Sequence, residues 1–317
     1  MHEQYLELKG IKKYFHTPGG PLHAVDEVSF TLEKGKTIGI VGESGCGKST
    51  LGRVVSRLLD ATGGEIIFKG ENILNYKGRQ LKELRRSIQM IFQDPFSSLN
   101  PRKTIYNTIA EPMITQRMFP DRGSVEKRAL EIMELVGLAE RYINAYPHEL
   151  DGGRRQRVGI ARALALEPEL IVCDEPVSAL DVSIQAQILN LLKRLQQQFS
   201  YTYIFITHDM SVVRHFTREV LVMYLGQMVE KASVKELFSN PKHPYTQALL
   251  SAIPSPDIDK KRDRIILKGE ITSPINPKDE CRFADRCVYV KEACRKKCPP
   301  LTDRGGEHFI RCYYPLL

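Results

Sequence analysis

The stretch from Gly42 to Thr50 has residue types and a spacing suited to binding the phosphates of a nucleotide. Its sequence, GESGCGKST, satisfies the pattern G-x-x-x-x-G-K-[ST] at every position. In such a loop the glycines let backbone N–H groups turn toward phosphate oxygens, Lys48 reaches the β- and γ-phosphates, and the Ser49 hydroxyl can ligate Mg²⁺. The same letters also fit a plain glycine-rich turn before a helix. We predict a nucleoside triphosphate site that includes Gly42, Ser44, Gly45, Cys46, Gly47, Lys48, Ser49 and Thr50.

The residues on either side of this loop favour the phosphate-binding interpretation. Thr37 to Val41 form a short apolar run typical of a buried strand, and apolar residues recur at helical spacing from Leu51 to Leu59. A strand, a glycine loop and a helix in that order direct backbone N–H groups and the positive end of a helix dipole toward one place. That place is where a phosphate would bind.

A pair of acids, Asp174 and Glu175, ends a second buried strand. The residues before them, Leu170 to Cys173, are all apolar, as is typical of a strand covered on both faces in a parallel sheet. An acid at that position can hold Mg²⁺ through its water shell, and the next acid can polarise an attacking water. Two acids can also simply cap the following helix. Because the chain also has a phosphate loop, we predict that Asp174 binds Mg²⁺.

Two further polar side chains follow predicted strands. Gln93 follows the apolar run from Ile88 to Phe92, and His208 follows the run from Tyr203 to Thr207. Taken alone, each would be an ordinary surface residue. In open α/β sheets, however, ligands bind beyond the carboxyl ends of the strands. We therefore expect Gln93 to reach the Mg²⁺ and its water, and His208 to touch a γ-phosphate.

The length and composition bound the class of protein. At 317 residues the chain is long for one hydrophobic core, and its 26% charged and 42% apolar residues are ordinary globular values. The N-terminal residues are polar and show no secretory signal, and no apolar run reaches the ~18 residues of a membrane span. We expect a cytoplasmic protein whose attachment to a membrane, if any, is made through a partner.

Outside these motifs, the spacing of apolar residues and the positions of Pro and Gly predict the order of strands and helices along the chain. Before the phosphate loop, alternating residues predict antiparallel strands with a break from Pro18 to Pro21, and Phe15 is a candidate either for stacking on a nucleotide base or for the β core. From Thr104 to about Leu166 the pattern is helical, which predicts an inserted helical subdomain at about 94–166. Breaks are expected within it at Pro120, Gly123, Gly137 and Pro147.

Five cysteines gather near the end of the sequence: Cys281, Cys287, Cys294, Cys298 and Cys312. Because no export signal is found, this clustering favours a metal over disulfides. The intervals before Cys287 and Cys294 are longer than those of usual zinc pairs, so a simple zinc site is the weaker interpretation. The surrounding sequence is basic, which fits a solvated surface, a nucleic acid or anionic lipid, or an anionic group bound there.

Six motifs stand in a fixed order: the phosphate loop, Gln93, LDGGRRQR at 150–157, the acid pair at 174–175, SALD at 178–181 and His208. Together they resemble the ATP-binding subunits of ATP-binding-cassette (ABC) transporters over residues 5–240. HPYT at 243–246 and the cysteines resemble the dipeptide and oligopeptide importers in particular. The resemblance implies an ATPase domain at 1–240 and an extension at 241–317. Its fold would be α/β, with a P-loop NTPase (RecA-like) core, an antiparallel β subdomain, an inserted α-helical subdomain and a small C-terminal cysteine-rich extension.

The resemblance also implies a role for each site residue. Phe15 would stack on adenine, Glu175 would be the general base, and His208 would hold the γ-phosphate. Mg²⁺ would be held by Ser49 and Asp174 and sensed by Gln93. Such subunits work as head-to-tail dimers, in which each ATP lies between the phosphate loop of one chain and the signature of the other.

The signature of this chain departs from the family pattern. That pattern is Leu-Ser-Gly-Gly-Gln, whereas here Asp151 replaces the serine, Gly152 and Gly153 are kept, and Arg154 replaces the glutamine. An ionised carboxylate can only accept hydrogen bonds, so Asp151 would meet a γ-phosphate with like charge, which Arg154 could partly offset. Because the signature acts on the partner's ATP, we expect an asymmetric heterodimer with a second ABC ATPase chain.

The cysteine segment resembles the iron-sulphur module at the C-terminus of some peptide-importer ATPases. The resemblance implies a [4Fe-4S] cluster held by Cys281, Cys287, Cys294 and Cys312, with Cys298 in place of Cys312 as the alternative. Reduced thiols without a metal are a third possibility. Such a cluster with its four thiolates is anionic, and five nearby basic residues could balance it: Arg282, Arg286, Arg295, Lys296 and Lys297.

The function implied by the resemblance is ATP hydrolysis that powers import of dipeptides or oligopeptides, by a subunit at the cytoplasmic face of the cell membrane. Its partners would be two integral membrane permease subunits and, indirectly, an extracytoplasmic peptide-binding protein. No nucleic acid is expected. The alternatives are import of another small solute such as nickel, and a non-transport ABC ATPase acting on nucleic acid. Non-transport relatives usually carry two cassettes or a coiled-coil or zinc insertion, and this sequence shows neither.

Overall fold

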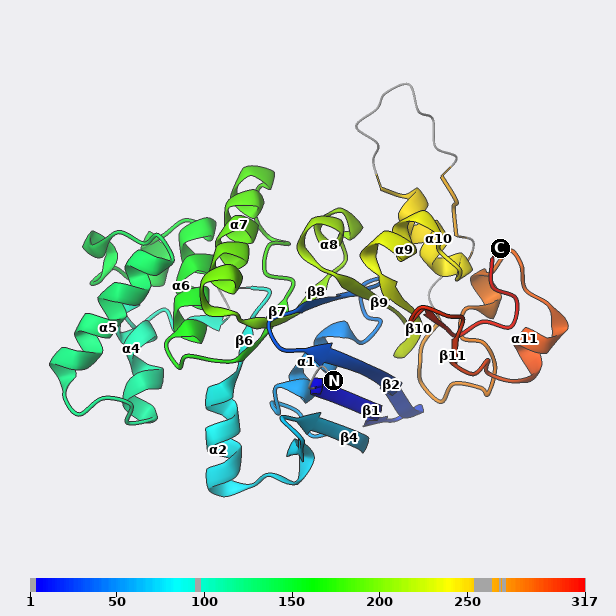
Figure 1. The fold of residues 1–317 in the computed structure, drawn as a ribbon, viewed down its shortest axis with the longest axis horizontal. Coiled ribbons are helices and arrows are strands. Elements are labelled where there is room, and N and C mark those ends of the chain that lie inside the picture. Colours follow the sequence, from blue (N-terminus) through cyan, green and yellow to red (C-terminus); the bar gives the residue numbers. More distant parts are fainter. Residues whose placement is uncertain (1–3, 95–97, 254–263, 268, 270–271, 317) are drawn as a thin grey trace. The chain divides into compact units, whose positions relative to one another are not determined.

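The computed structural model describes residues 4–94, 98–253, 264–267, 269 and 272–316. The chain divides into two compact units (Figure 1). The first is built from Met1–Leu74 and Phe205–Leu317, and the second from Asn75–Ile204. The first unit therefore joins two distant parts of the sequence, whereas the second is one continuous segment.

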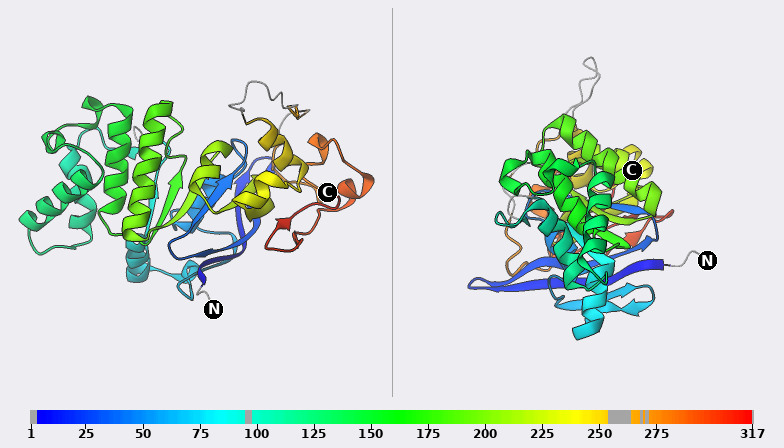
Figure 2. Two further views of the ribbon diagram at one scale, coloured as in Figure 1. Left: turned by 45° about the horizontal axis from the view of Figure 1, so that its top comes forward. Right: turned by 90° about the vertical axis from the view of Figure 1, so that its left-hand side faces the viewer.

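The first unit contains an antiparallel sheet with the strand order β2-β1-β4-β5. Its members are β1 (Gln4–Thr17), β2 (Gly20–Glu33), β4 (Gly63–Phe68) and β5 (Glu71–Asn72). The long hairpin of β1 and β2 is drawn in blue in Figure 2. Alternate apolar residues such as Leu6, Leu8 and Phe30 are buried, as the period of a strand requires. The predicted antiparallel strands are confirmed, and the predicted break coincides with the hairpin turn.

A second group of strands in the first unit carries the phosphate loop. β3 (Thr37–Val41) pairs in parallel with β9 (Glu219–Tyr224), and β9 pairs antiparallel with β10 (Gln227–Ser233). On its other side, β10 pairs with the short strand β12 (Phe309–Ile310), which in turn pairs with β11 (Thr302–Asp303). The helices of this unit are α1 (Lys48–Val55), α8 (Met210–Phe216), α9 (Val234–Ser239), α10 (Pro244–Ser251) and α11 (Glu292–Lys296). β8 (Thr202–Thr207) begins in the second unit and ends in the first.

The helix after the phosphate loop differs from the predicted one. It begins at Lys48, earlier than the predicted Leu51, and ends at Val55 rather than near Leu59. Arg57 has a φ of 54°, in the left-handed region that a right-handed helix cannot contain. The apolar residues at 58 and 59 thus continue the helical spacing without continuing the helix.

The second unit combines two parallel strands with a set of helices. β6 (Ile88–Ile91) pairs in parallel with β7 (Leu170–Asp174), and α2 (Gly78–Ser87) precedes β6. The helices α4 (Ile105–Thr115), α5 (Arg122–Leu135), α6 (Gly152–Leu164) and α7 (Val182–Phe199) are drawn in green shades in Figure 1. Helices therefore occupy the segment where a helical subdomain was predicted.

One of the breaks predicted in that segment is wrong. Gly123 lies inside the first turn of α5, because Asp121 caps this helix by accepting a hydrogen bond from the backbone N–H of Ser124 at 2.8 Å. A good N-cap stabilises a first turn by about 1 kcal/mol, which offsets the cost of a glycine there.

Candidate nucleotide site

The phosphate loop follows β3 and depends on two glycines. Gly42 has a φ of 152° and Gly47 a φ of 103°, both outside the range that other residues readily adopt. A Cβ added at Gly42 would lie 2.2 Å from the backbone oxygen of Met223, and one at Gly47 would lie 2.0 Å from that of Ala24. The loop is therefore packed so closely against its neighbours that only glycine fits at these positions.

Lys48 ends this loop as the first residue of α1. Its side chain is buried, with 4% of the residue exposed. The ammonium group donates to the backbone oxygens of Gly42 at 2.8 Å and Glu43 at 2.9 Å. The positive charge is thus held by the loop itself, where the β- and γ-phosphates of a nucleotide were predicted to bind.

The remaining loop residues divide into exposed and buried ones. Ser44 and Gly45 are exposed, and Ser49 and Thr50 are half-buried, so these four are accessible to a ligand. Cys46 is buried, and burial raises the pKa of its thiol. Because the thiolate is the reactive form, this thiol is a poor nucleophile, and Cys46 can contribute to a nucleotide site through its backbone.

The acid pair of the second unit lies at the end of β7, and Gln93 reaches it. All five residues of β7 are buried, and Asp174 is the last of them. Glu175 follows with a φ of 45°, an unusual backbone conformation for a residue with a side chain. The side-chain amide of Gln93 donates to Oε2 of Glu175 at 3.0 Å. The structure thus brings together two predicted site residues that are 82 positions apart.

The signature residues form the N-terminus of α6. Asp151 is its N-cap and accepts from the backbone N–H of Arg154 at 2.7 Å, while the Arg154 guanidinium lies 2.5 Å from its other carboxylate oxygen. The Asp151 side chain is 57% exposed. A Cβ at Gly153 would lie 2.7 Å from the side chain of Ile184 in α7, so close packing explains this glycine. Asp151 therefore has a local structural role besides the one predicted for it.

His208 and Phe15 belong to the first unit. His208 is exposed and lies between β8 and α8. Phe15 is half-buried on β1 opposite Leu22 of β2, and the ammonium of Lys13 lies 4.9 Å from the centre of its ring. Such a cation over the ring is a favourable contact. Stacking of Phe15 on adenine stays a prediction.

The C-terminal cysteines fall into two groups. Cys281, Cys287, Cys294 and Cys312 line one small pocket, together with aromatic residues that include Phe283 and Tyr313. Burial raises the pKa of Cys281 to about 12 and that of Cys312 to about 11, and the neighbouring thiols add to both shifts. Cys298 does not line this pocket, and its Sγ lies 3.6 Å from the side-chain oxygen of Gln227.

All seven cysteines are described, and each is a free thiol. Within the described ranges, no three or more His, Cys, Asp or Glu side chains form a group that could hold a metal ion. The pocket is therefore a gathering of four thiols, and the structure shows no metal-binding group in it.

The basic residues around these cysteines have other partners than the predicted anionic group. Arg282 pairs with Asp26, and Arg286 pairs with Glu43 at 2.6 Å. Arg295 pairs with Asp285 at 2.7 Å, and Lys296 pairs with Glu292 at 2.6 Å. Four of the five predicted counter-charges are therefore already balanced by carboxylates.

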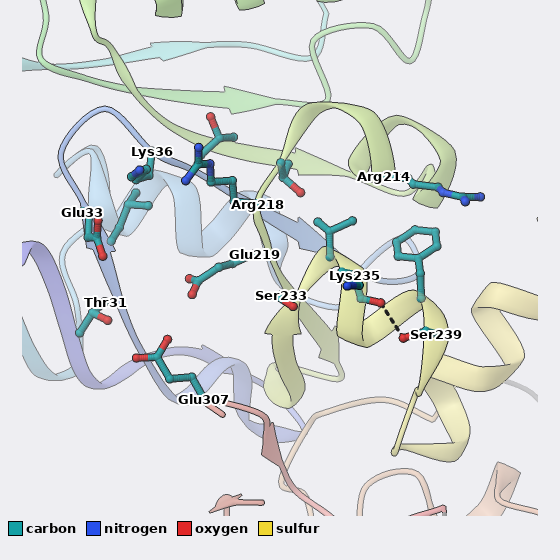
Figure 3. A pocket seen from close by; sticks show the side chains of 15 residues that line it. Thr31, Glu33, Lys36, Arg214, Arg218, Glu219, Ser233, Lys235, Ser239 and Glu307 are labelled. Atoms are coloured by element: carbon teal, nitrogen blue, oxygen red, sulfur yellow. Dashed lines mark hydrogen bonds between the residues drawn. The ribbon is translucent and has the colours of Figure 1, made fainter. Parts of the chain in front are cut away.

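The first unit also contains a larger pocket of about 880 Å³ (Figure 3). Thr37 and Glu219, the first residues of β3 and β9, contribute to its lining, so it lies at the amino ends of these strands. The phosphate loop follows the carboxyl end of β3, where ligands of α/β sheets bind. The lining carries both signs of charge, with Lys36, Arg214, Arg218 and Lys235 as well as Glu33, Glu219 and Glu307. This pocket is not the nucleotide site.

In the described part of the chain, no helix is both long enough and apolar enough to cross a membrane.

Comparisons with known proteins found related sequence families and individual relatives. A sequence family described as "ABC transporter" matches residues 25–178, and one described as "Oligopeptide/dipeptide transporter, C-terminal region" matches residues 229–294. The chain is 52% identical to the oligopeptide transport ATP-binding protein AppF of Bacillus subtilis, over 98% of this chain and 97% of that protein. It is 47% identical to the dipeptide transport ATP-binding protein DppF of Haemophilus influenzae, over 96% and 95%.

Solved structures resemble the chain as well. One is described as a dimeric post-hydrolysis state of the ATP-binding cassette MJ0796 bound to ADP and Pi, with a TM-score of 0.67, 31% identity, and coverage of 72% of this chain and 98% of that one. Another is cbiO1 from Clostridium perfringens, with a TM-score of 0.66, 28% identity, and coverage of 75% and 92%.

Proposed function

Because this chain belongs to the ABC transporter family, among its oligopeptide and dipeptide transport ATP-binding proteins, we propose that it hydrolyses ATP to drive peptide import. The observation that carries the proposal is the phosphate loop on β3, in which Lys48 is held by the loop carbonyls. The Gln93–Glu175 hydrogen bond in the second unit supports it. The fold is that of an α/β P-loop NTPase, as the likeness to solved ATP-binding cassettes shows.

Each site residue has a proposed role in hydrolysis. Glu175 would accept the proton of the attacking water, and Gln93, which is hydrogen-bonded to it, would help to orient that water. The Ser49 hydroxyl and the Asp174 carboxylate are oxygen donors of the kind that Mg²⁺ prefers, and the ion would neutralise charge between the β- and γ-phosphates. His208 would contact the γ-phosphate.

The subunit would be attached to the cytoplasmic face of the membrane through two permease subunits, which would receive peptides from a binding protein outside. Co-purification tests this arrangement. We expect the chain to be isolated with integral membrane subunits, and its ATPase activity to rise when a peptide-loaded binding protein is added. An ATPase that leaves the membrane fraction without partners and does not respond to peptide would contradict peptide import.

The active assembly would be a heterodimer with a second ABC ATPase chain. The similar MJ0796 cassette is described as dimeric, and in a head-to-tail dimer Asp151 would face the partner's nucleotide. The Asp151–Arg154 pair supports the expected charge compensation, since the two side chains are 2.5 Å apart. Reconstitution tests this. A homodimer of this chain that hydrolyses ATP as fast as any mixed pair would contradict it.

The cysteine pocket would hold a [4Fe-4S] cluster. The chemistry of the donors supports this proposal, because four thiols line one pocket and thiolates are the usual ligands of such clusters, although in the described residues their arrangement forms no metal-binding group. The position of Cys298 outside that lining favours Cys312 as the fourth ligand. When bound, the cluster would cross-link the C-terminal segment, which is the simplest role for it.

Metal analysis of anaerobically purified protein tests the cluster. We expect a brown protein with broad absorption near 400 nm that bleaches on reduction. Cys312→Ser should lose the iron, whereas Cys298→Ser, the matched control, should keep it. A colourless protein that holds zinc, or iron that is lost only with Cys298→Ser, would overturn this assignment.

A further inference from the structure

Glu43, the second residue of the phosphate loop, is bound by an arginine from the C-terminal segment. Arg286 donates from Nη1 to Oε2 of Glu43 at 2.6 Å and from Nη2 to Oε1 at 3.0 Å. Two parallel bonds of this kind fix orientation as well as distance. The side chains are only 8% and 26% exposed, so the pair is better shielded from water than an ordinary surface ion pair.

A second residue holds the backbone of Glu43. The hydroxyl oxygen of Tyr245 accepts a hydrogen bond from the Glu43 N–H at 2.9 Å. Tyr245 lies in the first turn of α10 and is completely buried. Both the side chain and the backbone of this loop residue are therefore fixed by residues that lie more than 200 positions later in the sequence.

Arg286 and Tyr245 are themselves firmly supported. Tyr224, Tyr245 and Phe283 are buried and pack on one another, with ring centres 4.8 to 5.4 Å apart. Tyr224 is the last residue of β9, which pairs with β3, and Phe283 precedes Arg286 by three residues. Side chains held by such packing can set the position of the loop to within a fraction of an ångström.

The arginine also lies in the cysteine segment. Cys281 and Cys287 line the cysteine pocket, and Arg286 is between them in the sequence, next to Cys287. Arg282, in the same stretch, pairs with Asp26 and donates to the backbone oxygen of Leu225. A rearrangement of the residues around these cysteines would therefore shift the group that holds Glu43.

We propose that Arg286 and Tyr245 are positioning residues of the ATP site, through which the C-terminal cysteine segment sets the conformation of the phosphate loop and the affinity for MgATP. The inference rests on the proposed binding of ATP at this loop. It requires no metal, because every contact in it belongs to side chains and backbone of this chain.

Equilibrium binding of MgATP to the full-length chain tests the proposal. We expect Arg286→Gln to raise the dissociation constant roughly tenfold, within the range usual for coupling between sites. The matched control is Arg295→Gln, which removes an exposed arginine of the same segment that pairs with Asp285. This control should stay within about twofold of the wild type, as expected for an exposed ion pair.

Two further variants separate positioning from general damage to the fold. Glu43→Gln should weaken binding as Arg286→Gln does, and the double variant should be no worse than the worse single variant, because both remove one interaction. Arg286→Lys should restore part of the affinity. Tyr245→Phe removes only the hydroxyl and should also weaken binding while the fold is kept, as near-ultraviolet circular dichroism would report.

The outcomes distinguish this inference from the proposed function. If the wild type does not bind MgATP, the proposed function fails. If the wild type and Arg295→Gln bind it and Arg286→Gln binds equally well, only this inference is overturned. Effects of Glu43→Gln and Arg286→Gln that simply add would also overturn it, since additivity means that the two side chains act independently.

Reciprocity gives an independent measurement. If the cysteine segment affects nucleotide binding, nucleotide binding must affect that segment by the same free energy. We expect MgATP to slow hydrogen exchange of the backbone amides at residues 282–287 in the wild type and to have little effect there in Arg286→Gln. Equal exchange with and without MgATP in the wild type would contradict the coupling.

Discussion

The position of the Glu175 side chain depends on an unusual backbone conformation and on a hydrogen bond from Gln93. A φ of 45° costs on the order of 1 kcal/mol for a residue with a side chain. Such a strained conformation persists only where the contacts of the surrounding structure enforce it. The hydrogen bond from Gln93 fixes the carboxylate from the other side. Both features suit a group that must be positioned over a reacting water.

Replacing Glu175 by Gln should therefore separate binding from hydrolysis. The amide is similar in size but cannot accept the proton, so we expect kcat to fall by roughly 10² to 10⁴. The affinity for MgATP should change little. Single-turnover hydrolysis and equilibrium binding check the two parts. Hydrolysis at the wild-type rate would exclude Glu175 as the general base.

His243 makes a prediction about pH. It is buried, and burial lowers the pKa of its imidazole from 6.5 to about 4, although the nearby Glu230 acts in the opposite direction. Its Nδ1 accepts a hydrogen bond from the N–H of Tyr245 at 3.1 Å, which requires the neutral ring. The folded state thus prefers the unprotonated form. Its stabilising contribution is complete above pH 6.5 and is lost as the pH falls from 6.5 toward 4.

The full effect, reached below pH 4, is on the order of 3 kcal/mol, because the pKa falls from 6.5 to about 4 and each unit of pKa corresponds to 1.36 kcal/mol. Urea unfolding at pH 7 and pH 4.5 measures most of it, with His243→Asn as the control because asparagine can cap α10 without titrating. The free energy of unfolding should fall less with acid in the variant. The same pH dependence in both proteins would refute the assignment.

Residue types and spacing are enough to find most of the candidate site. The phosphate loop and the acid pair are contiguous in the sequence, and each has chemistry that few other patterns share. The contacts of Glu43 with Tyr245 and Arg286 are different, because they join residues 202 and 243 positions apart and no local pattern marks them. The HPYT motif at 243–246 indicated the resemblance to the peptide importers, but it did not predict the contact between Tyr245 and Glu43.

At the level of elements, the connection between β3 and α1 depends on where the loop touches its neighbours. Gly47 and Gly45 both have positive φ, but only Gly47 also lies against another backbone. A Cβ at Gly45 would meet no atom within 4 Å, whereas one at Gly47 would overlap the oxygen of Ala24. Conformation and packing can therefore be tested separately.

Gly47→Ala should lower the free energy of unfolding by well over 2 kcal/mol and abolish nucleotide binding, because the loop must move away from β2. Gly45→Ala should cost only about 1 kcal/mol, the usual cost of a left-handed alanine. Thermal unfolding of both variants provides the comparison. If both variants lost the same free energy of unfolding, the left-handed backbone conformation alone would explain the need for glycine, and packing would not contribute.

Element boundaries were harder to predict than the elements themselves. The apolar spacing in α1 continues beyond Val55, but the left-handed Arg57 ends the helix. In α5 the cap from Asp121 overrides the glycine that was expected to break it. In the first case the backbone conformation of one residue sets where the helix ends, and in the second one hydrogen bond sets where it begins. The periodicity of apolar residues reveals neither of these features.

At the scale of the whole molecule, the altered signature predicts how the chain behaves in a dimer. Asp151→Ser with Arg154→Gln restores the family signature, and serine can still cap α6. If like charge at a partner's phosphate limits the homodimer, its ATPase activity should rise on the order of tenfold, which corresponds to about 1.4 kcal/mol. Steady-state ATPase assays of the chain alone provide the measurement.

Asp121→Ser is the matched control, because Asp121 is also an N-cap aspartate but belongs to α5. It should leave the activity unchanged. If the restored signature does not raise the activity, the asymmetry proposed for the assembly has another origin.

The general architecture could be predicted because strands, glycine loops and acids follow one another in a known order. The way the first unit is assembled could not. Its antiparallel sheet comes from the beginning of the sequence, and β9, β10 and β12 come from the end. Periodicity shows which face of a strand is buried, but not which distant strand lies beside it.

This division of the first unit has a consequence during synthesis. The second unit, Asn75–Ile204, is one continuous segment that is complete before β9 is made, whereas β3 must wait for β9. Glu43 waits longer still, since Arg286 follows it by 243 residues. At about 5–20 residues per second this is roughly 12 to 50 s of translation. The nascent chain therefore carries an unfinished phosphate loop for most of that time, and it completes the loop only when the cysteine segment has been made.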